Sequence, residues 1–267
     1  MLKYIYPIFL ILLPALVVAQ YRPTIVTGRP GQSIGGLTVG RQVYQLQTGL
    51  NINWIGEGAE KRTNLTETTV IRVGLLDHLE VSGVIAGASV ETTANGRTVR
   101  ERGISNTQLG LRYNFLQNSG WRPSLAVQGR ALLTAQDEAF RRDQTGANFI
   151  VSAGWSLTQT TGLTLNLNRS WSGNNTRATG YTAALGFNLG ENWSSFLEAY
   201  GSLSNKVTAN FDGGFGRLIG DNLLLDVSAG WQGQDGIPDY FLDFGLSFRI
   251  DGREVSDDRI NSRINEN

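Results

Sequence analysis

The sequence predicts an all-β protein, a transmembrane antiparallel up-and-down β-barrel of about twelve strands, and two observations favour that fold. Bulky apolar residues alternate with small or polar ones, as in the stretch 44–54. This period of two is typical of a strand with one apolar face. After residue 19, no apolar run approaches the ~20 residues that a spanning helix needs. If the mature chain crosses a membrane, it must do so as a closed barrel, the other structure that satisfies every backbone polar group there.

Residues 1–19 have the pattern of a secretory signal peptide. Lys3 gives a positive start, the apolar stretch 5–18 follows, and Val17-Val18-Ala19 resembles a cleavage site. The mature chain is therefore expected to begin at Gln20. A membrane-anchoring helix is the alternative, but two prolines interrupt a short apolar run, which disfavours it.

The alternation continues through most of the mature chain, which assigns residues 42–250 to the barrel. Strands of ten to thirteen residues, tilted by ~40°, would cover the ~25 Å apolar band of an outer-membrane barrel. The strands are expected near 42–54, 65–75, 79–90, 104–116, 122–134, 145–157, 162–171, 179–189, 193–203, 207–218, 223–231 and 239–250.

The connections between these strands also alternate in length. Barrels of this class have short periplasmic turns and longer external loops. Placing both termini in the periplasm puts nearly every long connection outside the cell. The connections expected outside are 55–64, 91–103, 135–144, 172–178, 204–206 and 232–238.

The bulky face of each strand is expected to face lipid, because the opposite face is mostly small, polar or charged. A wide soluble barrel would need its large side chains inside to fill the core. All six tryptophans fall at predicted strand ends or turns, where an indole ring can sit at the level of the lipid headgroups. These expected membrane-interface aromatics are Trp54, Trp121, Trp155, Trp171, Trp193 and Trp231.

The predicted inner face carries charges that differ in sign between the two halves of the barrel. Basic residues lie on the second to fifth strands and acidic residues on the ninth to twelfth, with Glu80 and Arg249 departing from that division. The charges could form internal ion pairs that stabilise or close the barrel, or they could orient polar solutes in an open lumen. The candidate lumen-lining residues are Arg72, Glu80, Arg112, Arg130, Glu198, Asp212, Asp226, Asp243 and Arg249.

Two segments flank the barrel. Residues 20–41 are rich in glycine and proline and show no strand pattern, so they could enter the lumen as a plug or remain a periplasmic lead. Residues 251–267 form a polar tail of mixed charge, expected to be a flexible periplasmic extension.

Composition argues against several function classes. The formal net charge is zero, without the basic excess typical of nucleic-acid binding. There is no cysteine and a single histidine, His78, in a predicted periplasmic turn, so neither a histidine-activated serine nor a cluster of histidine ligands is expected. Asp235 and Asp239 could bind calcium only weakly. We expect no catalytic residues, no cofactor and no metal site.

Several motifs resemble the outer-membrane family of meta-pathway phenol-degradation-like transporters, over residues 29 to 250. They include Arg29-Pro30-Gly31, the strand-turn-strand stretch 70–81, Gln108-Leu109-Gly110-Leu111-Arg112-Tyr113, the stretches 196–201, 212–214 and 225–230, Pro238-Asp239-Tyr240-Phe241 and Gly245-Leu246-Ser247-Phe248-Arg249. The resemblance implies passive passage of small hydrophobic or aromatic compounds. The polar tail after Ile250 departs from the strictly C-terminal assembly signal of such barrels.

Together these patterns favour a passive channel or transporter in the bacterial outer membrane. Its partners would be the lipid of that membrane and a small-molecule permeant, with no nucleic acid. A structural or surface-interaction barrel with a closed lumen is the alternative, and an enzyme is a third and weaker possibility. The residues do not indicate an oligomeric state.

Overall fold

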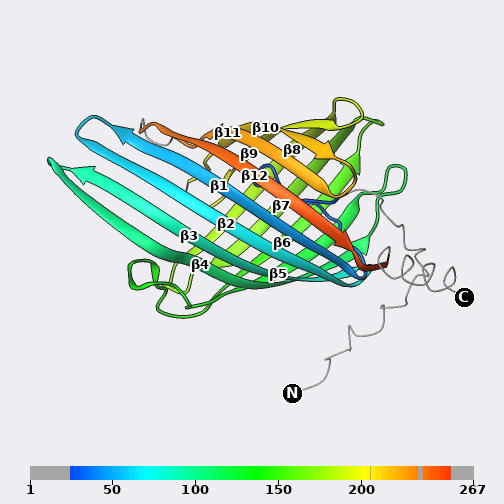
Figure 1. Ribbon diagram of the computed structural model, residues 1–267, viewed down its shortest axis with the longest axis horizontal. Coiled ribbons are helices and arrows are strands. Elements are labelled where there is room, and N and C mark those ends of the chain that lie inside the picture. The colour runs from blue at the N-terminus through cyan, green and yellow to red at the C-terminus, as the bar shows by residue number, and fades with distance from the viewer. Residues whose placement is uncertain (1–24, 205, 234–236, 254–267) are drawn as a thin grey trace, which may run out of the picture.

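The computed structural model describes residues 25–204, 206–233 and 237–253, which form a closed antiparallel barrel of twelve strands (Figure 1). Each strand pairs with its neighbours in the sequence, and β1 pairs with β12. All twelve predicted strands are present. Their bounds are β1 Val43–Glu57, β2 Glu60–Leu76, β3 Leu79–Ala94, β4 Arg97–Leu116, β5 Ser124–Leu132, β6 Gly146–Ser156, β7 Thr161–Trp171, β8 Arg177–Asn188, β9 Trp193–Ser202, β10 Asn210–Ile219, β11 Leu223–Trp231 and β12 Asp239–Asp251.

The regular structure is almost entirely strand. One short 3₁₀ turn, Glu138–Phe140, lies between β5 and β6. Among the described residues, no helix is long and apolar enough to cross a membrane. The predicted signal peptide and residues 254–267 of the predicted tail lie outside the described residues.

The connections gather at the two ends of the barrel. We call one end the turn end, which holds the connections 77–78, 117–123, 157–160, 189–192 and 220–222. The opposite end, called the loop end, holds the connections 58–59, 95–96, 133–145, 172–176, 203–209 and 232–238.

Two connections predicted as long external loops are instead strand. The segments 55–64 and 91–103 extend the β1–β2 and β3–β4 hairpins, which close with only two residues each. Asn95 and Gly96 both have positive φ, at 51° and 74°, the conformation that a tight type I′ hairpin turn requires. The prediction was wrong because both faces of these extended hairpins are polar, so the apolar alternation stops before the strand does.

The alternating residues separate onto two faces as expected. Closure pairs Leu50 with Phe244 and Trp54 with Tyr240, all of them exposed on the outer surface, whereas Gln45 pairs with the buried Arg249 inside. The outer surface is largely apolar around the barrel, apart from Glu67 of β2, whose carboxylate accepts hydrogen bonds from Thr48 and Thr69 there. Since a strand at the edge of an open sheet would leave its backbone groups unpaired in lipid, closure and an apolar exterior together make this a membrane-spanning barrel.

Neighbouring positions on β7 test this assignment of faces. Leu167 is 51% exposed on the outer surface, whereas Asn168 faces the lumen and lines a cavity there. Leu167→Arg should lower the free energy of unfolding by about 2–4 kcal/mol, because it places a charge in the apolar band. Asn168→Arg should cost much less. Equal losses of stability for the two variants in a denaturant titration in lipid vesicles would contradict the assignment.

Candidate functional site in the barrel lumen

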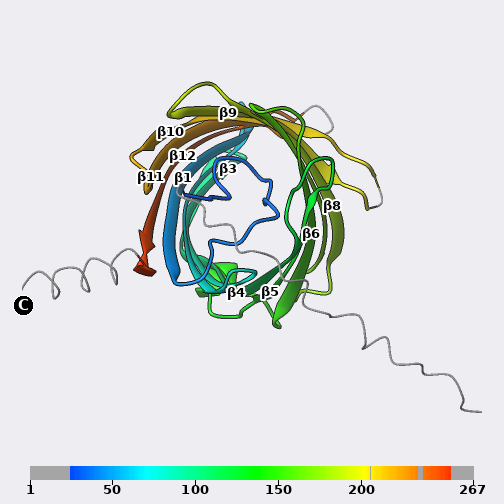
Figure 2. The same cartoon turned by 90° about the vertical axis from the view of Figure 1, so that its right-hand side faces the viewer.

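Residues 25–41, which we call the lead, run around the inside of the barrel near its turn end before entering β1 (Figure 2). At its start, the Ile25 N–H donates to the Asp221 carbonyl in the β10–β11 turn, at 3.0 Å. At its end, the hydroxyl of Thr38 donates to the Asp77 carbonyl in the β2–β3 turn, at 2.5 Å. Residues 25–41 therefore lie inside the barrel near its turn end, whereas residues 20–24 of the predicted segment lie outside the described residues.

The lead supplies the cation for the acidic side of the lumen. The Arg29 guanidinium donates to the Asp226 carboxylate of β11, at 3.2 Å, and also contacts the Asp243 carboxylate of β12. It lies against Gly49 and Gly245, at the positions that a Cβ of either residue would occupy. Glycine at these inward positions thus makes room for the lead.

Two wall side chains hold the middle of the lead, and we call Glu198 and Asn166 the clasp. The Glu198 carboxylate of β9 accepts the N–H groups of Gln32 and Ser33, at 2.7 and 2.9 Å. The Asn166 amide of β7 accepts the Ile34 N–H at 2.7 Å and donates to the Ile34 carbonyl at 2.8 Å. The clasp therefore satisfies the backbone of three consecutive residues that have no strand partner.

The basic side of the lumen holds the end of the lead. Arg72 of β2 forms a two-point ion pair with Glu80 of β3, at 2.8 and 2.7 Å, and Glu80 also accepts the Val39 N–H at 3.0 Å. Arg112 of β4 donates to the Leu37 carbonyl at 3.0 Å. Both members of the Arg72–Glu80 pair are almost fully buried, so this pair connects β2, β3 and the lead.

Two cavities lie on the β7–β10 side of the lumen, one on each side of the clasped segment. The inner cavity, toward the turn end, has a volume of about 610 Å³, and the outer one, toward the loop end, about 410 Å³. Ser33 lines the inner cavity and its neighbour Gln32 lines the outer one. A single stretch of chain therefore separates the two spaces.

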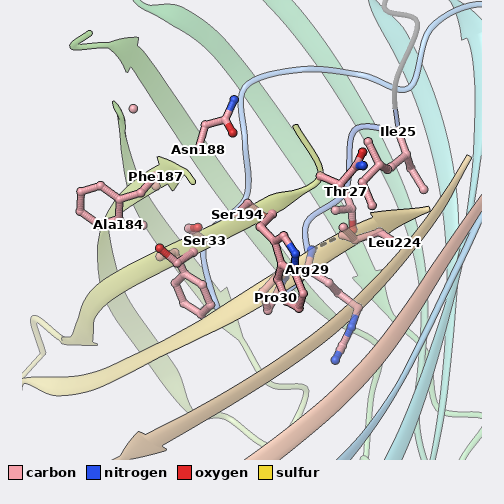
Figure 3. A pocket seen from close by; sticks show the side chains of 18 of the residues that line it. Ile25, Thr27, Arg29, Pro30, Ser33, Ala184, Phe187, Asn188, Ser194 and Leu224 are labelled. Atoms are coloured by element: carbon pink, nitrogen blue, oxygen red, sulfur yellow. Dashed lines mark hydrogen bonds between the residues drawn. The ribbon is translucent and has the colours of Figure 1, made fainter. Parts of the chain in front are cut away.

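The walls of both cavities are built largely from small or uncharged side chains. Figure 3 shows the inner cavity between the lead, with Ile25, Thr27 and Pro30, and the wall residues Ala184, Ser194 and Leu224. Gly162, Thr164, Gly186 and Gly216 also line that wall, together with larger side chains such as Phe187 and Phe196, and a Cβ at Gly186 would meet no atom within 4 Å. The wall of the outer cavity includes Asn168, Gly180, Thr182, Tyr200, Ser202 and Asn210.

The candidate lumen residues all occupy inward-facing positions, but the structure divides them into separate groups. Arg72, Glu80 and Arg112 lie together on β2–β4, with Arg130 on β5 beside them. Glu198 and Asp212 face each other across the β9–β10 pair, and both Asp212 carboxylate oxygens are buried without a hydrogen-bond partner. Arg249 lies apart at the turn end, where its Nε donates to Asn222 at 2.9 Å.

Other candidate residues lie at the ends of the barrel. All six tryptophans stand at strand ends or, for Trp121, in a turn, where it is 83% exposed. The Trp193 ring lies 5.0 Å from the Arg217 guanidinium, a cation–π contact. Asp239 accepts a hydrogen bond from Asn53 at 2.6 Å, whereas Asp235 lies outside the described residues.

Sequence reasoning missed Arg29 and Asn166 as lumen residues. A signal for Arg29 was available: four carboxylates on β9–β12 needed a cation, and the lead was the nearest segment able to bring one. Asn166 had no such signal, because an asparagine on an inward strand position is ordinary. Its role depends on a loop segment 132 residues earlier in the chain.

Comparison with solved structures shows the same fold at low sequence identity. An outer membrane channel from Pseudomonas putida F1 matches with a TM-score of 0.65 and 10% identity, over 83% of this chain and 99% of that one. The KdgM porin matches with a TM-score of 0.54 and 9% identity, over 76% and 98% of the two chains. No curated protein sequence matches significantly.

The family comparison covers most of the chain. Residues 27–250 match the profile of the family described as "Putative MetA-pathway of phenol degradation". The matched range begins in the lead and ends in β12, so it includes every element that builds the lumen. The chain belongs to this family of outer-membrane barrels.

Proposed function

We propose that this protein is a passive outer-membrane channel for small molecules, whose route follows the inner wall of β7–β10. The observation that carries the proposal is the pair of cavities on either side of the clasped segment of the lead. Cavities of roughly 300–1,000 Å³ hold small organic molecules. Displacing the segment 32–34 would join the two spaces into one passage between the ends of the barrel. The fold shared with a channel and a porin supports this role.

The opposite wall is less suited to passage. Large side chains fill the β1–β5 side, where Gln45, Arg72, Arg112 and Gln128 are each buried. A solute there would have to separate a buried ion pair from its partners, at a cost of several kcal/mol. On the β7–β10 side it would displace only peptide groups and small side chains.

The inner cavity indicates a permeant of mixed polarity. Pro30, Phe196 and Leu224 offer apolar surface, whereas the hydroxyls of Thr27 and Ser33 offer hydrogen bonds. Small aromatic molecules with one or two polar groups fit this lining, which agrees with the family description. Both barrel termini are proposed to face the periplasm, so the inner cavity would open toward that side.

A closed structural barrel is the second candidate, because the lead spans the lumen and is hydrogen-bonded to walls on both sides. We propose the channel rather than the closed barrel because only the two side chains of the clasp hold the middle of the lead. Each hydrogen bond to the Glu198 carboxylate contributes about 1.5–3 kcal/mol and each neutral bond about 1 kcal/mol, so local release costs less than unfolding the barrel. We also propose that the protein is not an enzyme.

The clasp can be tested by removing its side chains. Glu198→Ala combined with Asn166→Ala removes the partners of four backbone groups of the lead, the N–H groups of residues 32–34 and the Ile34 carbonyl. The segment 32–34 should therefore leave its position more often. We expect larger or more frequent openings in single-channel recordings in planar bilayers. Asn168→Ala, two residues along β7, removes an amide that lines the outer cavity without holding the lead, and should resemble the wild type. Recordings that are silent for all three proteins would favour the closed barrel.

The route can be tested independently by filling the inner cavity. Gly186→Leu adds a side chain to open space in the β8 wall, so it should lower conductance and slow the swelling of liposomes in small solutes. Gly83→Leu is the matched control, since Gly83 also has no atom within 4 Å of its would-be Cβ but faces outward on β3. If the two variants conduct equally, the route does not pass along β7–β10.

A further inference from the structure

Three guanidiniums on the basic side of the lumen surround one carboxylate. Arg72, Arg112 and Arg130 lie on inward positions of β2, β4 and β5, around Glu80 of β3. The Glu80 carboxylate is already occupied by both nitrogens of the Arg72 fork and by the Val39 N–H. Arg112 stands directly opposite Glu80 on the β3–β4 ladder, but its hydrogen bonds go to Leu37 and Gln128. The group therefore carries an excess of positive charge.

Arg112 and Arg130 have only neutral hydrogen-bond partners. Arg112 donates to the Leu37 carbonyl at 3.0 Å and to the Gln128 amide oxygen at 3.1 Å. Arg130 donates to the Gln108 amide oxygen at 3.4 Å, at the outer limit for a hydrogen bond. The Nε of each is buried without a partner. Within the part of the chain that the structure describes, neither forms an ion pair with a carboxylate.

The two signs of charge respond differently to such crowding. Facing carboxylates, such as Glu198 and Asp212, can share a proton and lower their repulsion. A guanidinium cannot lose its proton at any ordinary pH. A buried cation without a counter-charge is costly. The excess charge at Arg112 and Arg130 is therefore best balanced by an anion from solution.

The surroundings of Arg130 suit such an anion. Arg130 faces Gly110 on β4 and Asn148 on β6, and the Asn148 amide can donate a hydrogen bond, whereas the space beside Gly110 is taken by the Ser82 hydroxyl, the Gln128 amide and the Arg130 side chain itself. A fourth guanidinium, that of Arg142, lies in the β5–β6 connection at the loop end, where it donates to Asn106 at 3.0 Å. The row Arg142, Arg130 and Arg112 thus leads inward from the loop end.

We propose that Arg130 and Arg112, flanked by the amides of Gln108 and Gln128, bind the carboxylate group of a small organic acid. A planar carboxylate matches the fork of a guanidinium with two parallel hydrogen bonds, which a halide cannot form. Binding would offset charge that the protein itself leaves uncompensated. The site lies on β4 and β5, away from the route proposed along β7–β10, so the binding does not depend on the proposed channel function.

The test measures thermal unfolding of the purified full chain in detergent, at constant ionic strength, with sodium benzoate, sodium chloride or benzyl alcohol as the probe. Benzyl alcohol keeps the aromatic ring and lacks the charge. Benzoate should raise the melting temperature of the wild type in a concentration-dependent way, and the other two probes should not. Arg130→Gln should weaken the apparent affinity for benzoate at least about tenfold, as expected for loss of a charged hydrogen-bonded partner. Arg62→Gln, in the exposed β1–β2 hairpin, should leave it unchanged.

Two further readouts separate this site from a structural ion pair. Without benzoate, Arg130→Gln should melt at or above the wild-type temperature, because it removes a charge without a counter-charge. Arg130→Lys keeps the charge without the planar fork and should bind benzoate more weakly than the wild type. Equal shifts with chloride and benzoate, or unchanged benzoate affinity in Arg130→Gln, would overturn the proposal. A protein that binds benzoate but never conducts would retain this site and contradict the channel.

Discussion

Pairing of β1 with β12 is the constraint on which the rest of the structure depends. The ladder runs without a register shift from Val43 opposite Asp251 to Ile55 opposite Asp239, so the sheet has no free edge in the membrane. Closure gives every strand one lipid-facing side and one enclosed side. The outer side can then be largely apolar, and most of the polar variation lies in the lumen. The charges, the lead and the cavities are consequences of that confinement.

The lead and the barrel walls supply each other's hydrogen-bond and charge partners. An enclosed segment without strand partners needs donors and acceptors for its peptide groups, and wall side chains such as Glu198, Asn166 and Arg112 provide them. In return, Arg29 brings a cation to the carboxylates of β11 and β12. The lead is held unevenly along its length. Charged side chains that form ion pairs hold its two ends, whereas its middle is held by the two side chains of the clasp, which lie beside the cavities. That unevenness is the reason we propose the β7–β10 side as the place where the lumen opens.

The strands could be predicted from the sequence because lipid and lumen impose opposite demands on alternate residues. The prediction failed where the two environments become alike, as in the Arg97–Arg102 stretch, whose side chains are nearly all exposed. The inward positions of the charges followed from the same alternation, but their pairing did not. Ile34 meets Asn166, and Arg29 meets Asp243, across more than a hundred residues, so no local pattern could place the lead.

The position of the lead is the central claim, and a cross-link tests it most directly. A Cβ at Gly36 would lie 3.2 Å from the Ser124 Cβ of β5, so a shift of a few tenths of an ångström would bring the two into the ~3.5–4.5 Å range of a disulfide, and the chain has no native cysteine. Gly36→Cys with Ser124→Cys, oxidised in native outer membranes, should form the intramolecular disulfide in most molecules, as measured by mass spectrometry of the digested protein. Two thiols that both stay free and react with maleimide would place the lead outside the lumen.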